Sequence, residues 1–159
     1  MFTLMLECGL RVGEVCNLSL DDVFFDDLPR LKIHGKGGRQ RMVYLPPPAY
    51  STLKDWLNSR PVTKDRAVFI SQRGKRLSVN GVQFILQGYC QKAGVRVTCH
   101  QFRHAFGRCM AEANMPLTSL QVLLGHRSPR TTQMYARISN PALQAEYNRA
   151  IQRAWENLS

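Results

Sequence analysis

Residues 23–45 contain three short, mostly apolar segments separated by two turn sequences, and this pattern constrains the fold more than any other part of the chain. Val23–Phe25, Leu31–His34 and Arg41–Leu45 each have the length of a short strand, and Asp-Asp-Leu-Pro and Gly-Lys-Gly-Gly supply turn residues between them. Strands joined by such short connections pair in opposite directions. The pattern therefore predicts a three-stranded antiparallel sheet near the start of the chain.

Most of the remaining sequence is typical of helices. Apolar residues recur at helical spacing, Ser78 is a suitable N-cap, and Gly94 is a suitable stop. The expected helices are Phe2–Glu7, Gly13–Leu18, Ala49–Asn58, Ser78–Ala93, Gln101–Ala113, Pro116–Leu124, Thr131–Ala136 and Ala142–Trp155, with one more short strand at Val68–Ile70. We therefore expect an α+β fold, a mainly α-helical single domain over residues 1–159 with the small antiparallel sheet near its N-terminus.

The charge of the chain is strongly positive and unevenly distributed. Lys and Arg total 22 against 11 Asp and Glu, which gives a net charge of +11 at pH 7. Residues 28–76 hold 12 Lys or Arg and two acidic residues, and residues 92–137 hold seven Lys or Arg and one acidic residue. A surface of this kind favours a polyanion such as nucleic acid, although a generally basic protein would have the same composition.

Two further features indicate the cellular environment. No apolar run approaches the roughly 20 residues of a membrane-spanning helix, and the apolar start lacks the parts of a signal peptide. The five cysteines are odd in number and form no Cys-x-x-Cys pair, which argues against a disulfide framework or a zinc site. We expect a soluble protein of the bacterial cytoplasm or nucleoid, with free thiols and no membrane contact.

Six reactive or cationic side chains stand out, although each has an ordinary explanation when it is considered alone. They are Arg11, Lys36, His100, Arg103, His126 and Tyr135. Arg11 could simply pair with Glu14, Lys36 could be a solvated turn lysine, and Tyr135 could be a core aromatic.

Together, however, the six residues fit one reaction, the transfer of a phosphoryl group. Two arginines and a histidine can hold one phosphate, a tyrosine hydroxyl can attack it, and a lysine can protonate the departing oxygen. Cationic donors can replace a metal in this chemistry, and the sequence shows no carboxylate cluster for Mg²⁺. We therefore expect no metal and no other cofactor.

The blocks that hold these residues resemble the tyrosine recombinase family, which includes phage integrases and Xer recombinases. The matching blocks are Gly9–Glu14 (Gly-Leu-Arg-x-x-Glu), Gly35–Gly37 before a strand ending in Leu45-Pro46, His100–His104 (His-x-Leu-Arg-His), Leu123–His126 (Leu-Gly-His) and Thr131–Tyr135 (Thr-Thr-x-x-Tyr). Gly13 and Phe102 depart from the common residues at positions without a catalytic role. Five blocks in the family's order are much more specific than any one of them.

The resemblance implies site-specific recombination or integration of DNA, as in phages and other mobile elements, without ATP. Tyr135 would form a 3′-phosphotyrosine, Arg11, Arg103 and His126 would hold the phosphate, Lys36 would act as general acid, and His100 would assist. Glu14 and His104 would support these groups, whereas Arg39, Arg41 and Arg127, which lie beside catalytic positions, are expected to bind DNA. The implied partners are double-stranded DNA and further copies of the chain, which form a synaptic tetramer in relatives.

The two ends of the chain leave questions open. Relatives carry an N-terminal DNA-binding domain and one more catalytic-domain helix before the block of Arg11, and we expect both to be absent here. This keeps two alternatives open: a truncated or catalytically impaired DNA-binding protein, and a type IB topoisomerase-like enzyme that nicks and reseals one strand. Residues 141–159 are expected either to pack on their own domain or to dock on a neighbouring subunit.

Overall fold

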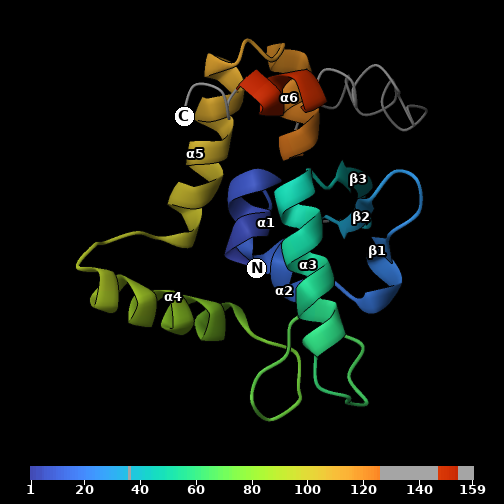
Figure 1. Cartoon of the computed structure of the whole chain (residues 1–159), viewed down its shortest axis with the longest axis vertical. Helices are drawn as coiled ribbons and strands as arrows, with labels where there is room; N and C mark the ends of the chain where they lie inside the picture. The colour runs from blue at the N-terminus through green and yellow to red at the C-terminus, as the bar shows by residue number, and fades with distance from the viewer. Residues whose placement is uncertain (36, 126–146, 154–159) are drawn as a thin grey trace.

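The computed structural model describes residues 1–35, 37–125 and 147–153 (Figure 1). Its elements in chain order are α1 (Phe2–Glu7), α2 (Val12–Asn17), the 3-10 turn η1 (Leu20–Asp22), β1 (Val23–Phe24), β2 (Arg30–His34), β3 (Gln40–Tyr44), α3 (Pro47–Ser59), α4 (Val79–Ala93), α5 (Cys99–Glu112) and α6 (Leu117–Leu124). Residues 147–153 are also helical. The predicted α+β fold, mainly helical with a three-stranded antiparallel sheet, is confirmed.

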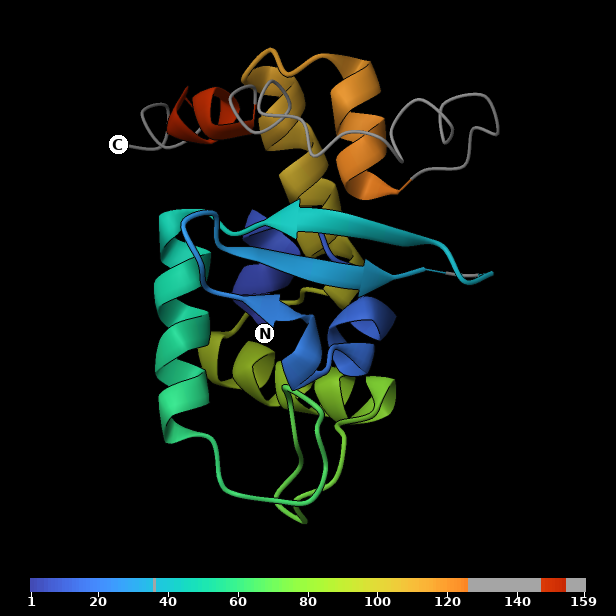
Figure 2. The ribbon, with the colours of Figure 1, turned by 90° about the vertical axis from the view of Figure 1, so that its right-hand side faces the viewer.

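The sheet has the strand order β1-β2-β3, and both of its pairs are antiparallel. Along β2 the side chains of Leu31 and Ile33 are buried, whereas the residues between and beside them are more exposed, as the alternation of a half-buried strand requires. Leu31 and Ile33 pack in one core cluster with Leu4 and Met5 of α1. Figure 2 shows this arrangement, with α1 behind the sheet and α3 beside it.

A second core cluster lies at the opposite end of α5 from α4, at the top of Figure 1. It joins the second half of α5 to α6 and to residues 147–153. Its largest fully buried side chains are those of Tyr147 and Phe106. Because α1 packs against α5 and α5 packs against α6, the two clusters hold the start of the chain close to the end of α6.

The expected start of α3 and the expected strand at 68–70 were wrong for identifiable reasons. Helix α3 begins at Pro47 rather than Ala49, because a helix's first turn leaves its N–H groups unpaired and therefore accepts proline, which has none. Residues 68–70 form no strand. Instead the carbonyl of Val68 accepts a hydrogen bond of 2.9 Å from the Trp56 indole, and the segment makes only isolated bridges at Ala67 and Ile70.

The helix ends near the site are set by local sequence. Helix α5 starts at Cys99, two residues before its expected start, because the Thr98 hydroxyl accepts a hydrogen bond from the Gln101 N–H and the Gln101 side chain bonds back to the Thr98 N–H. Helix α4 runs from its Ser78 cap to Ala93 and ends at Gly94 in the left-handed conformation, as predicted.

The described part of the tail belongs to the chain's own core. Tyr147 is 1% exposed and Ile151 is 8% exposed, and both pack in the second cluster. This is the intramolecular alternative for residues 147–153. The expected helix Thr131–Ala136 lies outside the described residues.

All five cysteines are free thiols, as predicted, and Cys8, Cys16 and Cys99 are buried. Within the described ranges, no helix combines the length and the apolar character that crossing a membrane requires.

Candidate active site

Arg11 lies at the break between α1 and α2, and a glycine allows it to reach this position. Gly9 adopts a positive φ of 64°, and a Cβ atom there would lie 2.5 Å from the ring of Phe106. The chain can therefore turn against α5 only with glycine at this position. Arg11 then caps α2, and its side chain remains 46% exposed.

Glu14 is a buried carboxylate that binds two arginines. Its oxygens accept hydrogen bonds from the Arg11 main-chain N–H at 2.8 Å and from Arg11 Nη1 at 3.2 Å. They also accept two hydrogen bonds from Arg41, with Nη1 to Oε1 at 2.7 Å and Nη2 to Oε2 at 3.0 Å. Burial alone would raise the pKa of Glu14, but hydrogen bonds and positive charges from Arg41 and Arg11 lower it below its usual value. The carboxylate therefore stays ionised and orients Arg11.

Arg103 comes from the second turn of α5, and only 6% of this residue is exposed. Its Nη1 donates to the main-chain oxygen of Gly9 and its Nη2 to that of Leu124, both at 2.5 Å. Burial, together with the positive charges of Arg11 and Arg41, lowers the pKa of Arg103 to about 10. The side chain therefore carries its charge at neutral pH, and it joins the start of α2 to the end of α6.

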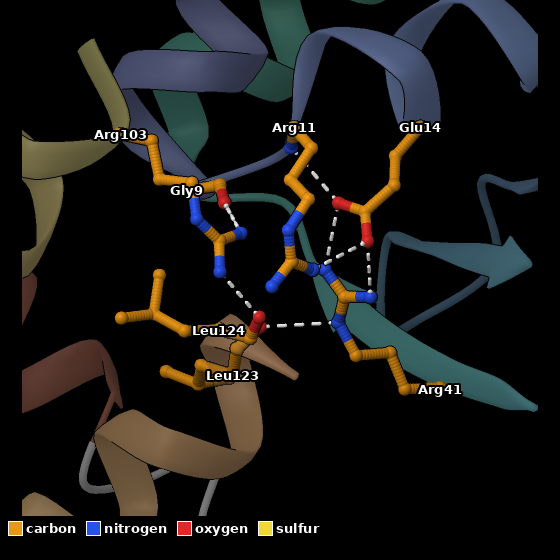
Figure 3. Close-up of polar contacts among 7 residues, drawn as sticks. All are labelled: Gly9, Arg11, Glu14, Arg41, Arg103, Leu123 and Leu124. Atoms are coloured by element: carbon orange, nitrogen blue, oxygen red, sulfur yellow. Dashed lines mark hydrogen bonds and ion pairs between the residues drawn. The ribbon is translucent and has the colours of Figure 1, made fainter. Parts of the chain in front are cut away.

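Figure 3 shows the guanidinium groups of Arg11, Arg41 and Arg103 between the start of α2, the end of α6 and strand β3. Among these charges Glu14 is the carboxylate that the arginines contact. Three positive charges against one negative charge leave an excess of two. Of the three guanidinium groups, that of Arg11 is the most accessible to a ligand, because its side chain is half-exposed. The chemistry of the group fits an anion with several oxygens, such as a phosphate.

His100 and His104 occupy the first turns of α5 and form an exposed pair. Their Nε2 atoms lie 2.7 Å apart and their rings meet edge to face, with centroids 4.2 Å apart. One ring must donate and the other accept in this contact, so the tautomers of the two histidines are coupled. His104 thus contacts the His100 ring directly, and its supporting role stays a prediction.

The structure brings together three of the predicted site residues, and it places Arg39 and Arg41 in different environments. Arg11, Arg103 and Glu14 meet at the break before α2, as expected. Arg39 is exposed, as a DNA-binding residue should be, whereas Arg41 is drawn into the ion pair with Glu14. Lys36, His126, Arg127 and Tyr135 lie outside the described residues.

The sequence revealed neither the main-chain acceptors of the site nor the ion pair of Arg41 with Glu14. The carbonyl oxygens of Gly9, Leu123 and Leu124 anchor Arg103 and Arg41, and no side-chain motif reveals a carbonyl. For Arg41 a signal existed. Strand alternation places it on the same face of β3 as Val43, which is buried.

A metal site and an apolar groove are the two alternatives to this cationic group. Within residues 1–35, 37–125 and 147–153, no group of three or more His, Cys, Asp or Glu side chains is arranged to hold a metal ion. A groove of about 380 Å³ lies between α1, α3 and α4, but its lining is mostly apolar and includes Leu4, Trp56 and Phe69. The cationic group around Arg11 is therefore a better candidate for chemistry on an anionic substrate.

Comparison with known proteins identifies relatives along most of the chain. The model of the phage integrase family matches residues 1–141. The chain is 36% identical over 156 residues to the tyrosine recombinase XerC of Caldanaerobacter subterraneus, covering 94% of this chain and 43% of that protein. It is 38% identical over 151 residues to the tyrosine recombinase XerA of Pyrococcus furiosus, covering 92% and 52%. The chain thus spans about half the length of these relatives.

Solved structures agree with the sequence match. A crystal structure of XerA recombinase superposes with a TM-score of 0.74 at 28% identity, covering 92% of this chain and 55% of that one. XerH site-specific recombinase, solved in a post-cleavage complex with its palindromic difH substrate, gives a TM-score of 0.68 at 26% identity, covering 91% and 42%. The chain therefore belongs to the phage integrase family and corresponds to the catalytic domain of its tyrosine recombinases.

Proposed function

We propose that this chain cuts and rejoins DNA as a site-specific recombinase, with Tyr135 as the nucleophile. The observation that carries the proposal is the half-exposed guanidinium of Arg11 beside the buried charge of Arg103, held by the ionised carboxylate of Glu14. A phosphodiester in this position would receive hydrogen bonds and positive charge as its oxygens become more negative in the transition state. The names of the relatives, which are tyrosine recombinases, support the same reaction.

In the proposed cleavage step, the Tyr135 oxygen attacks the phosphorus atom while the bond from phosphorus to the 5′ oxygen breaks. Lys36 donates a proton to the departing 5′ oxygen, and the tyrosine proton passes to a base or to water. The products are a 3′-phosphotyrosine and a 5′-hydroxyl. The reverse attack, by a 5′-hydroxyl from another duplex, restores the DNA backbone in a recombined form. The phosphotyrosine retains the energy of the broken bond, so the proposal requires no ATP.

The phosphate ligands come from three parts of the chain. Arg11 and Arg103 supply guanidinium groups from the start of α2 and from α5, and His126 is proposed as a third donor. His100, whose ring contacts His104, would assist in proton transfer. We assign Arg39 and Arg127 to DNA contacts outside the reaction centre.

The proposal is tested by incubating the chain with two differently labelled duplexes. A recombinase joins strands from the two duplexes, whereas a type IB topoisomerase-like enzyme nicks and reseals each one separately. A truncated or impaired DNA-binding protein forms complexes with either duplex and leaves every strand intact. Joined strands that carry both labels are expected, and intact strands after prolonged binding would contradict the proposal.

Assembly on DNA and cellular location follow from the same proposal. Joining two duplexes needs more than one active subunit, so we propose that copies of the chain associate on DNA. Sedimentation with one-site and two-site DNA measures this association. An enzyme with this substrate would act in the cytoplasm or nucleoid, where cellular DNA lies.

A further inference from the structure

Arg41 lies on β3, with its side chain on the inner face of the sheet. It pairs across the sheet with Ile33 of β2, which is buried, and its guanidinium contacts Glu14 in the first turn of α2. Its side chain is 15% exposed. Arg39, two positions earlier, is exposed. The two arginines therefore differ in environment although they are close in the sequence.

Each of the three nitrogens of the Arg41 guanidinium donates to a group of the chain itself, which uses three of its five N–H groups. Nη1 and Nη2 bind the two oxygens of Glu14 at 2.7 and 3.0 Å, and Nε donates to the main-chain oxygen of Leu123 at 3.1 Å. The Arg41 side chain is 15% exposed against 46% for Arg11, so Arg41 is the less accessible of the two to a phosphate. The same contacts connect two parts of the site, the carboxylate that orients Arg11 and the last turn of α6.

Gly125 provides a second, independent observation. It ends α6 in the left-handed conformation, with φ of 60°. A Cβ atom there would lie 3.1 Å from Arg41 Nη1 and 3.2 Å from its Cζ. The guanidinium therefore lies directly against the backbone of Gly125, the residue immediately before His126 in the sequence. The glycine accommodates both the turn and the arginine.

We propose that Arg41 is a positioning residue of the phosphate site and that it does not bind DNA. It holds the Glu14 carboxylate beside Arg11. Through its contacts with Leu123 and Gly125, it also holds the end of α6, which His126 follows in the sequence. This assignment rests on the proposed function, and it replaces the DNA-binding role expected from the sequence.

The test separates DNA affinity from the rate of cleavage in the full chain. Wild type, Arg41→Gln and the control Arg39→Gln are compared on nicked duplexes with a randomised core, which trap the covalent product. Dissociation constants are measured over a range of salt concentrations, and the rate and final extent of adduct formation are measured at saturating DNA. Urea unfolding shows whether each variant is folded.

For Arg41→Gln we expect unchanged affinity, an unchanged salt slope and cleavage slower by about 100-fold, the cost of misplacing a reacting group by roughly 1 Å. Arg39→Gln should instead bind more weakly and lose about one unit of the salt slope, as expected for a phosphate contact. The assignment is overturned if Arg41→Gln loses affinity and slope in the same way. It is equally overturned if the folded fraction reacts at the wild-type rate and only the final extent falls, because that result indicates a purely structural role.

Removing one partner of a buried ion pair can lower the free energy of unfolding by about 3–5 kcal/mol, so Arg41→Gln can fail to fold. Arg41→Lys is the second variant for that outcome. Lysine keeps a charge beside Glu14 but cannot bind both carboxylate oxygens and Leu123 together. We expect this variant to fold and bind DNA normally and to cleave slowly, and wild-type cleavage would contradict the assignment. If wild type itself forms no adduct, the proposed function fails, and the salt slopes of the variants still decide whether Arg41 contacts DNA.

Discussion

Tyr147 donates a hydrogen bond of 2.7 Å to the main-chain oxygen of Glu7, 140 positions earlier in the chain. Burial, reinforced by the neighbouring Cys8 and Glu7, raises the pKa of the Tyr147 hydroxyl well above its usual value, so the hydroxyl remains a donor at neutral pH. The contact joins the described part of the tail to α1, whose end leads directly to Gly9 and Arg11. The helix at residues 147–153 therefore contacts the segment that leads to the site, and it also fills the second core cluster.

Replacing Tyr147 with phenylalanine should lower the free energy of unfolding by about 1–2 kcal/mol, since the buried carbonyl of Glu7 would lose its partner. Urea unfolding measures the change, which should appear in the midpoint and not in the slope. Tyr89→Phe is the matched control, because Tyr89 is 60% exposed and its hydroxyl should contribute little. Equal midpoints for the two variants would show that the Tyr147 hydroxyl does not stabilise the fold.

The stability conferred by Glu14 should depend on pH. Because the pKa of Glu14 is lower in the folded chain than its ordinary value of 4.5, its contribution is complete above pH 4.5 and is lost as the pH falls through the folded pKa. Glu14→Gln should therefore be much less stable than wild type near pH 7, and the difference should shrink toward about pH 3. Urea unfolding of wild type and Glu14→Gln at both pH values measures this difference. The other carboxylates are the same in both proteins, so their contributions to the free energy of unfolding cancel. A difference that stays constant with pH would contradict the proposed ionised state of Glu14.

DNA binding by the chain should be weakly sequence-specific and steeply dependent on salt. The basic residues of 28–76 and 92–137 provide the charges. If about six phosphates are contacted, the logarithm of the binding constant should fall against the logarithm of salt concentration with a slope of roughly −5. Fluorescence anisotropy with unrelated duplexes measures the slope, and a value near zero would remove the electrostatic basis of DNA binding.

Cleavage should be insensitive to EDTA. Arg11 and Arg103 can supply the positive charge that a metal ion provides in other phosphoryl-transfer enzymes. Adduct formation is compared in chelator and in excess Mg²⁺, with a metal-dependent nuclease as the control for effective chelation. Loss of the adduct in EDTA and its return with Mg²⁺ would mean that the arginines are insufficient.

Local sequence signals predicted the elements better than the contacts between them. The turn residues around Gly35–Gly38 indicated the hairpin, and Ser78 and Gly94 marked the ends of α4, because these signals act within a few residues. Residues 68–70 form no strand, because the neighbouring segments pair with this part of the chain only through isolated bridges at Ala67 and Ile70. The carbonyl of Val68 is bound by the Trp56 indole, which is a tertiary contact. Local propensity contains no information about such a partner.

The same distinction holds for the site. Motif order identified Arg11, Glu14 and Arg103, and the structure brings them together. Arg41 was assigned to DNA because a basic residue beside catalytic positions is usually solvated. Its actual partners, Glu14 and Leu123, lie 27 and 82 positions away, and only the fold brings them within reach.

Covalent attachment of the chain to DNA is the most direct test of the proposed reaction of Tyr135. Wild type and Tyr135→Phe are incubated with nicked duplexes in which cleavage releases a short strand and so prevents resealing, and denaturing gels detect protein bound to labelled DNA. Wild type should form an adduct that protease digestion reduces to a phosphotyrosine, and Tyr135→Phe should bind the same duplexes but form none, because its ring lacks the attacking oxygen. An adduct that persists in Tyr135→Phe, or its absence from wild type under conditions of saturated binding, would contradict the central claim.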